Sequence, residues 1–263
     1  MIDTYKRQFL AAQDAARYDE NEYREGSYAH LLWELEKTAL SDLVADLRRT
    51  HGQISYLDFA AGTGRVSAHL ETIVDNAIAI EISQSMAARA GQRLRATQVL
   101  CRDITAKGAA IEDKYDLITA FRFFLNAEPD LRVAATRALA GRLRDESSLL
   151  VFNNHGNLWS LKILVWPYHR MRSAQKGWQP QGNYLRHTQI KRLLESAGLR
   201  IVKVIGLGFL GGKIAARLPF ERSLRLERWF SANWFCSKFG QDQIYVACLD
   251  CRASGNATSR TEA

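Results

Sequence analysis

The chain has 263 residues, and its 47% hydrophobic and 24% charged content is typical of a globular protein. This length suits one large α/β domain, and no uncharged apolar run approaches the roughly 20 residues that a membrane span needs. The N-terminus lacks the apolar core of a signal peptide, so we expect a cytoplasmic protein. The cysteines show no disulfide pattern, and the single CxxC lies in an expected strand, so we expect no metal site.

The formal net charge of +8 is distributed unevenly along the chain. Residues 158–240 hold 15 Lys and Arg residues against 3 Asp and Glu residues, a balance of +12, whereas residues 1–157 hold 19 against 22. This asymmetry indicates that the basic half binds an anionic partner. The alternative is that it forms a basic face exposed to solvent.

Strand-like and helix-like segments alternate through the first 153 residues. Residues 28–49 are expected to form an amphipathic helix, because leucines recur there at helical spacing. Strands are expected at residues 54–59, 77–81, 97–102, 115–121 and 148–153, with helices at 66–73, 84–95 and 130–144. This alternation predicts a parallel sheet with helices on both faces.

The regularity lapses after residue 153. Residues 155–186 are rich in aromatic and basic residues and show no clear strand. A helix is expected at 188–197 and strands at 200–205 and 243–249, whereas the basic, aromatic stretch 219–239 receives no assigned element.

The strongest chemical signal is the run 56–65, Tyr-Leu-Asp-Phe-Ala-Ala-Gly-Thr-Gly-Arg, which joins a strand end, a glycine turn and a helix start. Such a turn lets a ligand approach the backbone closely, as both dinucleotides and S-adenosylmethionine do. Three acids, Asp58, Glu81 and Asp103, end three successive expected strands. Carboxylates would repel the two phosphates of a dinucleotide but suit a sulfonium and an ammonium, so the pattern favours S-adenosylmethionine.

The run resembles motif I of the class I S-adenosylmethionine-dependent methyltransferases, whose common form is Asp-x-Ala/Gly-x-Gly-Thr-Gly. The resemblance covers roughly residues 28–155 and continues more weakly to 250. It implies that motif I wraps the methionine part of the cofactor, that Glu81 binds both ribose hydroxyls, and that Asp103 binds the adenine amino group. The cofactor-binding residues implied are Asp58, Ala60, Gly62, Gly64, Glu81, Met86, Asp103, Ile104 and Phe121, with Ile104 and Met86 on the two faces of adenine.

The family also implies a Rossmann-like, doubly wound α/β fold: a mostly parallel seven-stranded sheet with a late antiparallel strand and an inserted substrate-cover segment. We therefore expect residues 1–251 to form a single domain, followed by a disordered tail at 252–263. Within the domain we expect a helical cap at 1–50, a cofactor-binding core at 51–155, a substrate cover at 156–186 and the rest of the sheet at 187–251.

The acceptor side is less defined. Arg122, after the fourth strand, lies near the transferred methyl in this family and either orients an acidic group or pairs with a neighbouring acid. His155 is the preferred general base, because histidine titrates near neutrality, with His187 in reserve, although methyl transfer can proceed by positioning alone. Trp159, Arg170 and Arg172 are expected to contact the acceptor, since aromatic rings stack on flat groups and arginine binds phosphate or carboxylate. The alternative is that the aromatic residues form a helical stripe packed in the core, with a basic edge exposed to solvent.

The leading hypothesis is an enzyme that methylates, at oxygen, a small-molecule, sugar or lipid-linked acceptor carrying an acidic group. The alternative is a non-catalytic protein of the same fold that binds nucleic acid or a membrane surface through its basic half. The chain has no recognised DNA- or RNA-binding module, and residues 220–239 suit either an anionic membrane surface or packing on the sheet. A second glycine-rich run, 206–211, matches GxGxxG but is interpreted as a simple connection, because no acid-ended strand follows it.

Overall fold

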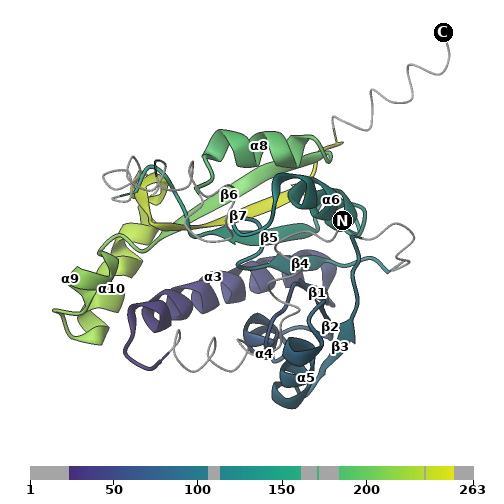
Figure 1. Ribbon diagram of the computed structural model, residues 1–263, viewed down its shortest axis with the longest axis horizontal. Helices are drawn as coiled ribbons and strands as arrows, with labels where there is room; N and C mark the ends of the chain where they lie inside the picture. The colour runs from purple at the N-terminus through teal and green to yellow at the C-terminus, as the bar shows by residue number, and fades with distance from the viewer. Residues whose placement is uncertain (1–23, 106–112, 161–170, 172–183, 234, 252–263) are drawn as a thin grey trace, which may run out of the picture.

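The computed structural model describes residues 24–105, 113–160, 171, 184–233 and 235–251 (Figure 1). Its centre is a seven-stranded sheet with the order β3-β2-β1-β4-β5-β7-β6. The strands are β1 (Ser55–Phe59), β2 (Asn76–Glu81), β3 (Thr97–Cys101), β4 (Leu117–Ala120), β5 (Leu149–Asn154), β6 (Leu199–Leu207) and β7 (Asp242–Leu249). Among these strands β7 alone runs opposite to the other six, which confirms the predicted Rossmann-like sheet with one late antiparallel strand.

Helices cover both faces of this sheet. The described helices are α3 (Tyr28–His51), α4 (Arg65–Leu70), α5 (Gln84–Arg93), α6 (Pro129–Ala140), α8 (His187–Glu195), α9 (Gly211–Ala215), α10 (Phe220–Ala232) and the 3-10 turn η2 (Cys236–Phe239). Figure 1 shows α3, α4 and α5 on one side and α6 and α8 on the other. Adjacent strand residues divide accordingly: Tyr56 packs with the α3 leucines, and Leu57 packs with α6 and α8.

The predicted elements of the first 153 residues are present, with small differences at their ends. β4 spans four residues where seven were expected, since Tyr115 makes only an isolated bridge with Leu143 and residues 121–127 form turns. The helix predicted at 130–144 ends at Ala140, because the chain turns at Gly141 to make that bridge.

The stretch 219–239, which had no predicted element, forms helix α10 and the turn η2. The buried face of α10 carries Ser223, Leu224 and Glu227, so two of its three buried residues are polar. This composition hides the helical periodicity that an apolar stripe would show.

Glu227 also explains the second glycine-rich run. Its fully buried carboxylate accepts hydrogen bonds from the backbone N–H groups of Gly208, Phe209 and Leu210 at 2.8–3.1 Å. An internal acid therefore occupies the N–H groups that a phosphate would need, and the run connects β6 to α9.

The carboxyl ends of five parallel strands and of β6 lie at one edge of the sheet. β6 is antiparallel to β7 and β7 is antiparallel to β5, so β6 points the same way as β5. Gln243 of β7 pairs with both Asn154 and Gly206, near the ends of β5 and β6. The segment that follows β5 and the helices that follow β6 consequently both leave the sheet at its ligand-binding edge.

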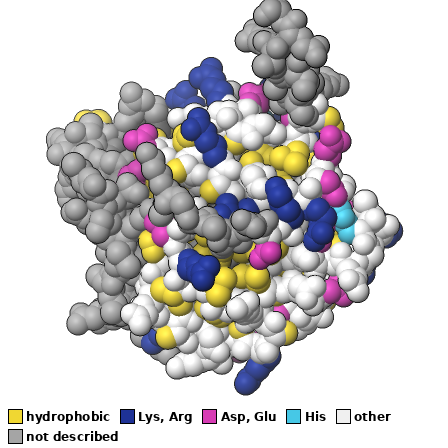
Figure 2. Space-filling view, turned by 90° about the vertical axis from the view of Figure 1, so that its right-hand side faces the viewer, with side chains coloured by type: hydrophobic (Ala, Val, Ile, Leu, Met, Phe, Trp, Pro, Cys, Tyr) yellow, Lys and Arg dark blue, Asp and Glu magenta, His cyan; other side chains and the backbone are white. Residues whose placement is uncertain are grey.

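No helix of the described residues is long and apolar enough to cross a bilayer. On the face shown in Figure 2, basic and acidic side chains of the described residues are interspersed.

Candidate functional site

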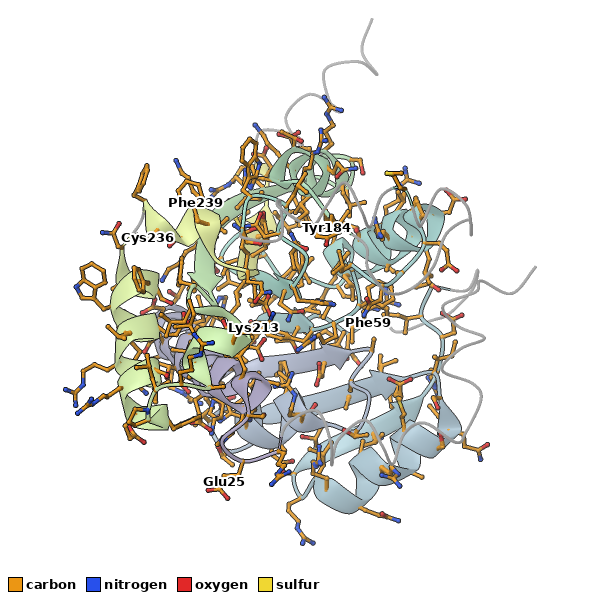
Figure 3. All side chains as sticks on the ribbon, turned by 60° about the vertical axis from the view of Figure 1, so that its left-hand side comes forward. Glu25, Phe59, Tyr184, Lys213, Cys236 and Phe239 are labelled. Carbon is orange, nitrogen blue, oxygen red and sulfur yellow. The ribbon has the colours of Figure 1, made fainter. Side chains whose placement is uncertain are left out.

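A pocket lies where β1, β2 and β4 end. Phe59 marks this end of β1 in Figure 3. The residues lining the pocket are Asp58, Phe59, Ala60, Ala61, Gly62, Thr63, Arg65, Val66, Ile80, Glu81, Ile82, Met86, Arg102, Asp103, Thr105, Phe121, Arg122, Phe123, Asn126 and Leu131. Most of the residues that the sequence assigned to cofactor binding are thus brought together in one place.

The glycine turn between β1 and α4 forms one wall of the pocket. Ala60, Gly62 and Gly64 all adopt positive φ angles of 56°, 59° and 79°. A Cβ at Gly64 would lie 3.0 Å from the Cδ1 of Leu94, so glycine is needed there both for its conformation and for close packing against the end of α5. For Ala60 the left-handed conformation is strained, as is common at binding sites.

Glu81 is the best-defined acid of the pocket. Its buried carboxylate accepts hydrogen bonds from the Gly62 N–H at 2.7 Å and the Ser83 N–H at 2.8 Å, one on each oxygen. Burial raises the pKa of Glu81, and the N–H groups of Ser83 and Gly62 oppose that rise. Each carboxylate oxygen has a second lone pair, so the group is oriented and still able to accept two hydroxyl groups.

Asp58 anchors the pocket floor. Its oxygens accept hydrogen bonds from Ser67 Oγ at 2.6 Å and from Thr119 Oγ1 at 2.8 Å. Because the Thr119 hydroxyl donates to Asp58, the Tyr56 hydroxyl, 2.6 Å away, must donate to Thr119. Burial raises the pKa of Asp58, and the bond from Ser67 opposes it. This carboxylate therefore ties β1 to α4 and β4 at the place where the cofactor turn begins.

The remaining predicted cofactor residues divide into two groups. Met86 and Phe121 line the pocket with buried side chains. Asp103 lines it with a partly exposed side chain, whose Oδ1 accepts from the Thr105 N–H at 2.9 Å and from the Thr105 hydroxyl. Ile104 instead packs into the hydrophobic core beneath the sheet edge, and Thr105 takes its place among the lining residues described.

Arg65 is a pocket residue to which the sequence gave no role. Its guanidinium lies 4.1 Å from the ring centroid of Trp33 and 3.2 Å from the buried Glu36 carboxylate. The other Glu36 oxygen accepts from the Asn153 side chain at 3.3 Å. The only sequence signals were an arginine directly after motif I and an acid within the leucine pattern of α3, which is too little to predict the contact.

Arg122 has a left-handed backbone, with φ 60°. Two asparagines hold it: the Arg122 N–H donates to Asn153 Oδ1, and the Asn126 side chain donates to the Arg122 carbonyl, both at 2.7 Å. Strained residues that the surrounding structure holds in place cluster at binding and catalytic sites.

The other predicted acceptor residues are not among the residues that line the pocket as described, or they lie outside the described residues. His155 is half-buried in the loop after β5 and does not line the pocket as described. Trp159 is 61% exposed in the same loop. His187 stacks on Tyr245, with its Nδ1 3.2 Å from the hydroxyl, and burial lowers its pKa. Arg170 and Arg172 lie outside the described residues.

These residues fit S-adenosylmethionine in chemistry as well as placement. Glu81 is oriented to accept two hydroxyls, Asp103 supplies an acceptor for an amino group, and Arg65 supplies a cation for a carboxylate. The fold and the site define the class I S-adenosylmethionine-dependent methyltransferases.

Comparison with known proteins agrees with this class. The methyltransferase domain family matches residues 28–204, about two thirds of the chain, so this chain belongs to that family. No curated protein sequence matches it significantly.

Solved structures resemble the chain at low sequence identity and therefore bear on the fold. The magnesium protoporphyrin IX methyltransferase of Synechocystis PCC 6803, crystallised with S-adenosylhomocysteine, is 14% identical, with a TM-score of 0.60 over 93% of this chain and 98% of its own. An S-adenosylmethionine-dependent methyltransferase of Archaeoglobus fulgidus is 14% identical, with a TM-score of 0.58 over 90% and 100%. One from Clostridium acetobutylicum is 17% identical, with a TM-score of 0.53 over 90% and 97%.

The chain is accordingly an enzyme, an S-adenosylmethionine-dependent methyltransferase, rather than the non-catalytic protein considered as an alternative.

Proposed function

We propose that this enzyme transfers the methyl group of S-adenosylmethionine to an oxygen of a small-molecule, sugar or lipid-linked acceptor that carries an acidic group. The observation that carries this proposal is Arg122. Two asparagine side chains hold its strained backbone at the end of β4, in the wall of the cofactor pocket. A cation in that place is suited to orient a carboxylate or phosphate of the acceptor.

The residues of the chain mainly bind the cofactor and position the acceptor. When bound, S-adenosylmethionine supplies an electrophilic methyl group and leaves as S-adenosylhomocysteine. Glu81 and Asp103 would hold the adenosine part and the turn 60–64 would hold the methionine part. Arg65 would pair with the cofactor's carboxylate, and the buried Met86 and Phe121 would exclude water. Orientation of this kind can provide much of the rate, because the sulfonium is already a good leaving group.

A hydroxyl acceptor loses its proton as the C–O bond forms. His155 is the proposed base, since it follows β5 at the same edge of the sheet as the pocket. If His155 accepts that proton, replacement by Asn should lower kcat most at neutral and higher pH, because a histidine that is already protonated at acidic pH cannot act as a base. An unchanged pH profile would mean that methyl transfer proceeds by positioning alone.

Methyl transfer from tritiated S-adenosylmethionine into fractionated cell extract tests the acceptor. The proposal expects label in an anionic compound, attached through oxygen. With the acceptor in hand, Arg122→Ala should raise its KM about tenfold or more, by loss of a charge-assisted bond, and leave the Kd of S-adenosylhomocysteine unchanged. Arg137→Ala, on the exposed face of α6, is the matched control. Label in a neutral compound, or on nitrogen or carbon, would contradict the proposal.

We also propose that residues 1–251 act as one domain. The helix α3 belongs to the expected cap at 1–50, yet its leucines share a core with Tyr56 and Leu117 of the sheet. Trp159, Arg170 and Arg172 of the segment 156–186 are proposed to contact the acceptor, because that segment leaves β5 at the pocket edge. Limited proteolysis that released a stable fragment ending near residue 155 would contradict this organisation.

A further inference from the structure

The helices after β6 leave apolar side chains in contact with solvent. We call the described residues of the stretch 211–239 the helical lobe; it contains α9, α10 and η2 and extends beyond the end of the sheet (Figure 1). Eight large hydrophobic side chains are exposed in the described part of the chain, and five of them belong to the helical lobe: Ile214, Leu226, Trp229, Phe235 and Phe239. Phe239 lies at the periphery of the molecule in Figure 3. This clustering in one stretch of the chain differs from the singly scattered apolar residues of an ordinary protein surface.

Apolar and basic side chains share the exposed face of α10. Leu226 is 41% and Trp229 64% exposed, and their spacing of three makes them neighbours on one side of the helix. Arg222 and Arg225 are also exposed, and each lies four residues before one of them. The exposed face of α10 therefore presents two apolar side chains to solvent, each with an arginine one helical turn before it.

The charge of the helical lobe has one dominant sign. Its exposed basic residues are Lys213, Arg217, Arg222, Arg225, Arg228 and Lys238. Glu221 is its only exposed acid, since Glu227 is buried against the backbone N–H groups of 208–210. The face drawn in Figure 2 mixes both signs, so this lobe differs from that part of the surface.

The same Glu227 contacts fix the orientation of this face. They join α10 to the end of β6, and Tyr28 of α3 adds a bond from its hydroxyl to Glu227 at 3.4 Å. The exposed face is consequently already formed before any partner binds.

We propose that the helical lobe docks on an anionic lipid bilayer. Leu226 and Trp229 would enter the boundary between headgroups and acyl chains, and the arginines would pair with lipid phosphates. Nucleic acid would satisfy the arginines but would gain little from aliphatic Ile214 and Leu226. The lobe follows β6, whose carboxyl end lies at the same edge as the pocket, so docking would bring the pocket close to the membrane. This inference goes beyond the proposed function and does not depend on it.

Flotation of the full chain with lipid vesicles tests the proposal. The chain should float with vesicles of phosphatidylcholine and phosphatidylglycerol but not with phosphatidylcholine alone, and added salt should release it. The double variants Leu226→Ser with Trp229→Ser, and Arg222→Glu with Arg225→Glu, should each reduce the bound fraction roughly tenfold. Val202→Ser on β6, an exposed apolar residue outside the lobe, and Arg137→Glu on α6 are the controls and should float as the parent does.

The Kd for S-adenosylhomocysteine, measured in solution, should be the same for all these proteins, which also shows that they are folded. Failure of the parent to float with anionic vesicles, or equal flotation of all variants, would overturn the docking proposal while leaving the enzymatic one untouched. The surface would be assigned to nucleic acid instead by a different result. In that case the parent would not float, and an RNA oligonucleotide would bind the parent and the Leu226–Trp229 variant but not the arginine variant.

Discussion

At the scale of single residues, Glu81 is the group on which cofactor affinity should depend most. Glu81→Gln should weaken S-adenosylhomocysteine binding about 10- to 100-fold, because a charged acceptor of ribose hydroxyls is worth roughly 1.5–3 kcal/mol. Glu195→Gln, on the exposed end of α8, is the control. Calorimetric titration of both variants measures the difference, and equal Kd values would contradict the assigned role.

The pH dependence of this affinity follows from the same contacts. The cofactor binds the ionised carboxylate, so affinity is complete above the pKa of Glu81 and falls as the pH drops through it. Burial raises that pKa, so the fall should begin at a higher pH than an ordinary glutamate would give. Titrations between about pH 7 and about pH 4.5 should show the decline in the parent and a flatter curve in Glu81→Gln.

Arg65 should recognise the amino-acid end of the cofactor. Arg65→Ala should weaken S-adenosylhomocysteine binding about tenfold or more, through loss of a charge-assisted bond to the carboxylate. The affinity of 5′-methylthioadenosine, which has no carboxylate, should stay the same. The variant also leaves Glu36 buried without its cation, so Arg65→Ala with Glu36→Gln is needed to separate binding from stability. Parallel losses for both ligands in the double variant would place Arg65 in a purely structural role.

At the scale of elements, Glu71 joins the end of α4 to the start of β3. Its carboxylate accepts hydrogen bonds from the N–H groups of Arg95, Ala96 and Thr97 and from the Thr97 hydroxyl at 2.9–3.1 Å. Partial burial opposes ionisation, but these bonds, led by the one from Ala96, hold the pKa of Glu71 below its usual value. A lowered pKa contributes stability that is present above the unfolded-state pKa and is lost as the pH falls through the folded-state value.

Glu71→Ala should therefore lower the free energy of unfolding by about 1 kcal/mol at neutral pH, a value that allows for the partial solvent exposure of the group. The difference from the parent should shrink as the pH falls below about 4, through the lowered pKa of Glu71 in the folded state. Urea unfolding at several pH values measures it, with Glu195→Ala as the control. A deficit that persists unchanged at acid pH would show that the carboxylate charge is not involved.

Elements whose buried side is apolar were predictable, and those with polar buried faces were not. The α3 leucines and the alternation around motif I gave the sheet and its cofactor edge, because those patterns are local in sequence. α10 was missed because Ser223 and Glu227 occupy its buried face. The contact of Arg65 with Glu36 was missed because it joins residues 29 apart that only the packing of α3 on α4 brings together.

At the scale of the whole molecule, the pocket is formed by segments from both halves of the cofactor core, since its lining runs from Asp58 to Leu131. A ligand that bridges these segments binds only the folded chain, so S-adenosylhomocysteine should raise Tm. At a free concentration 100 times its Kd, the gain is about 2.7 kcal/mol of unfolding free energy, equivalent to about 5 °C or more. NAD should leave Tm unchanged, because the carboxylates gathered around the glycine turn disfavour its phosphates. Thermal unfolding with each ligand measures this, and Glu81→Gln should need a proportionally higher S-adenosylhomocysteine concentration for the same shift. Stabilisation by NAD without stabilisation by S-adenosylhomocysteine would contradict the placement of these carboxylates around the cofactor.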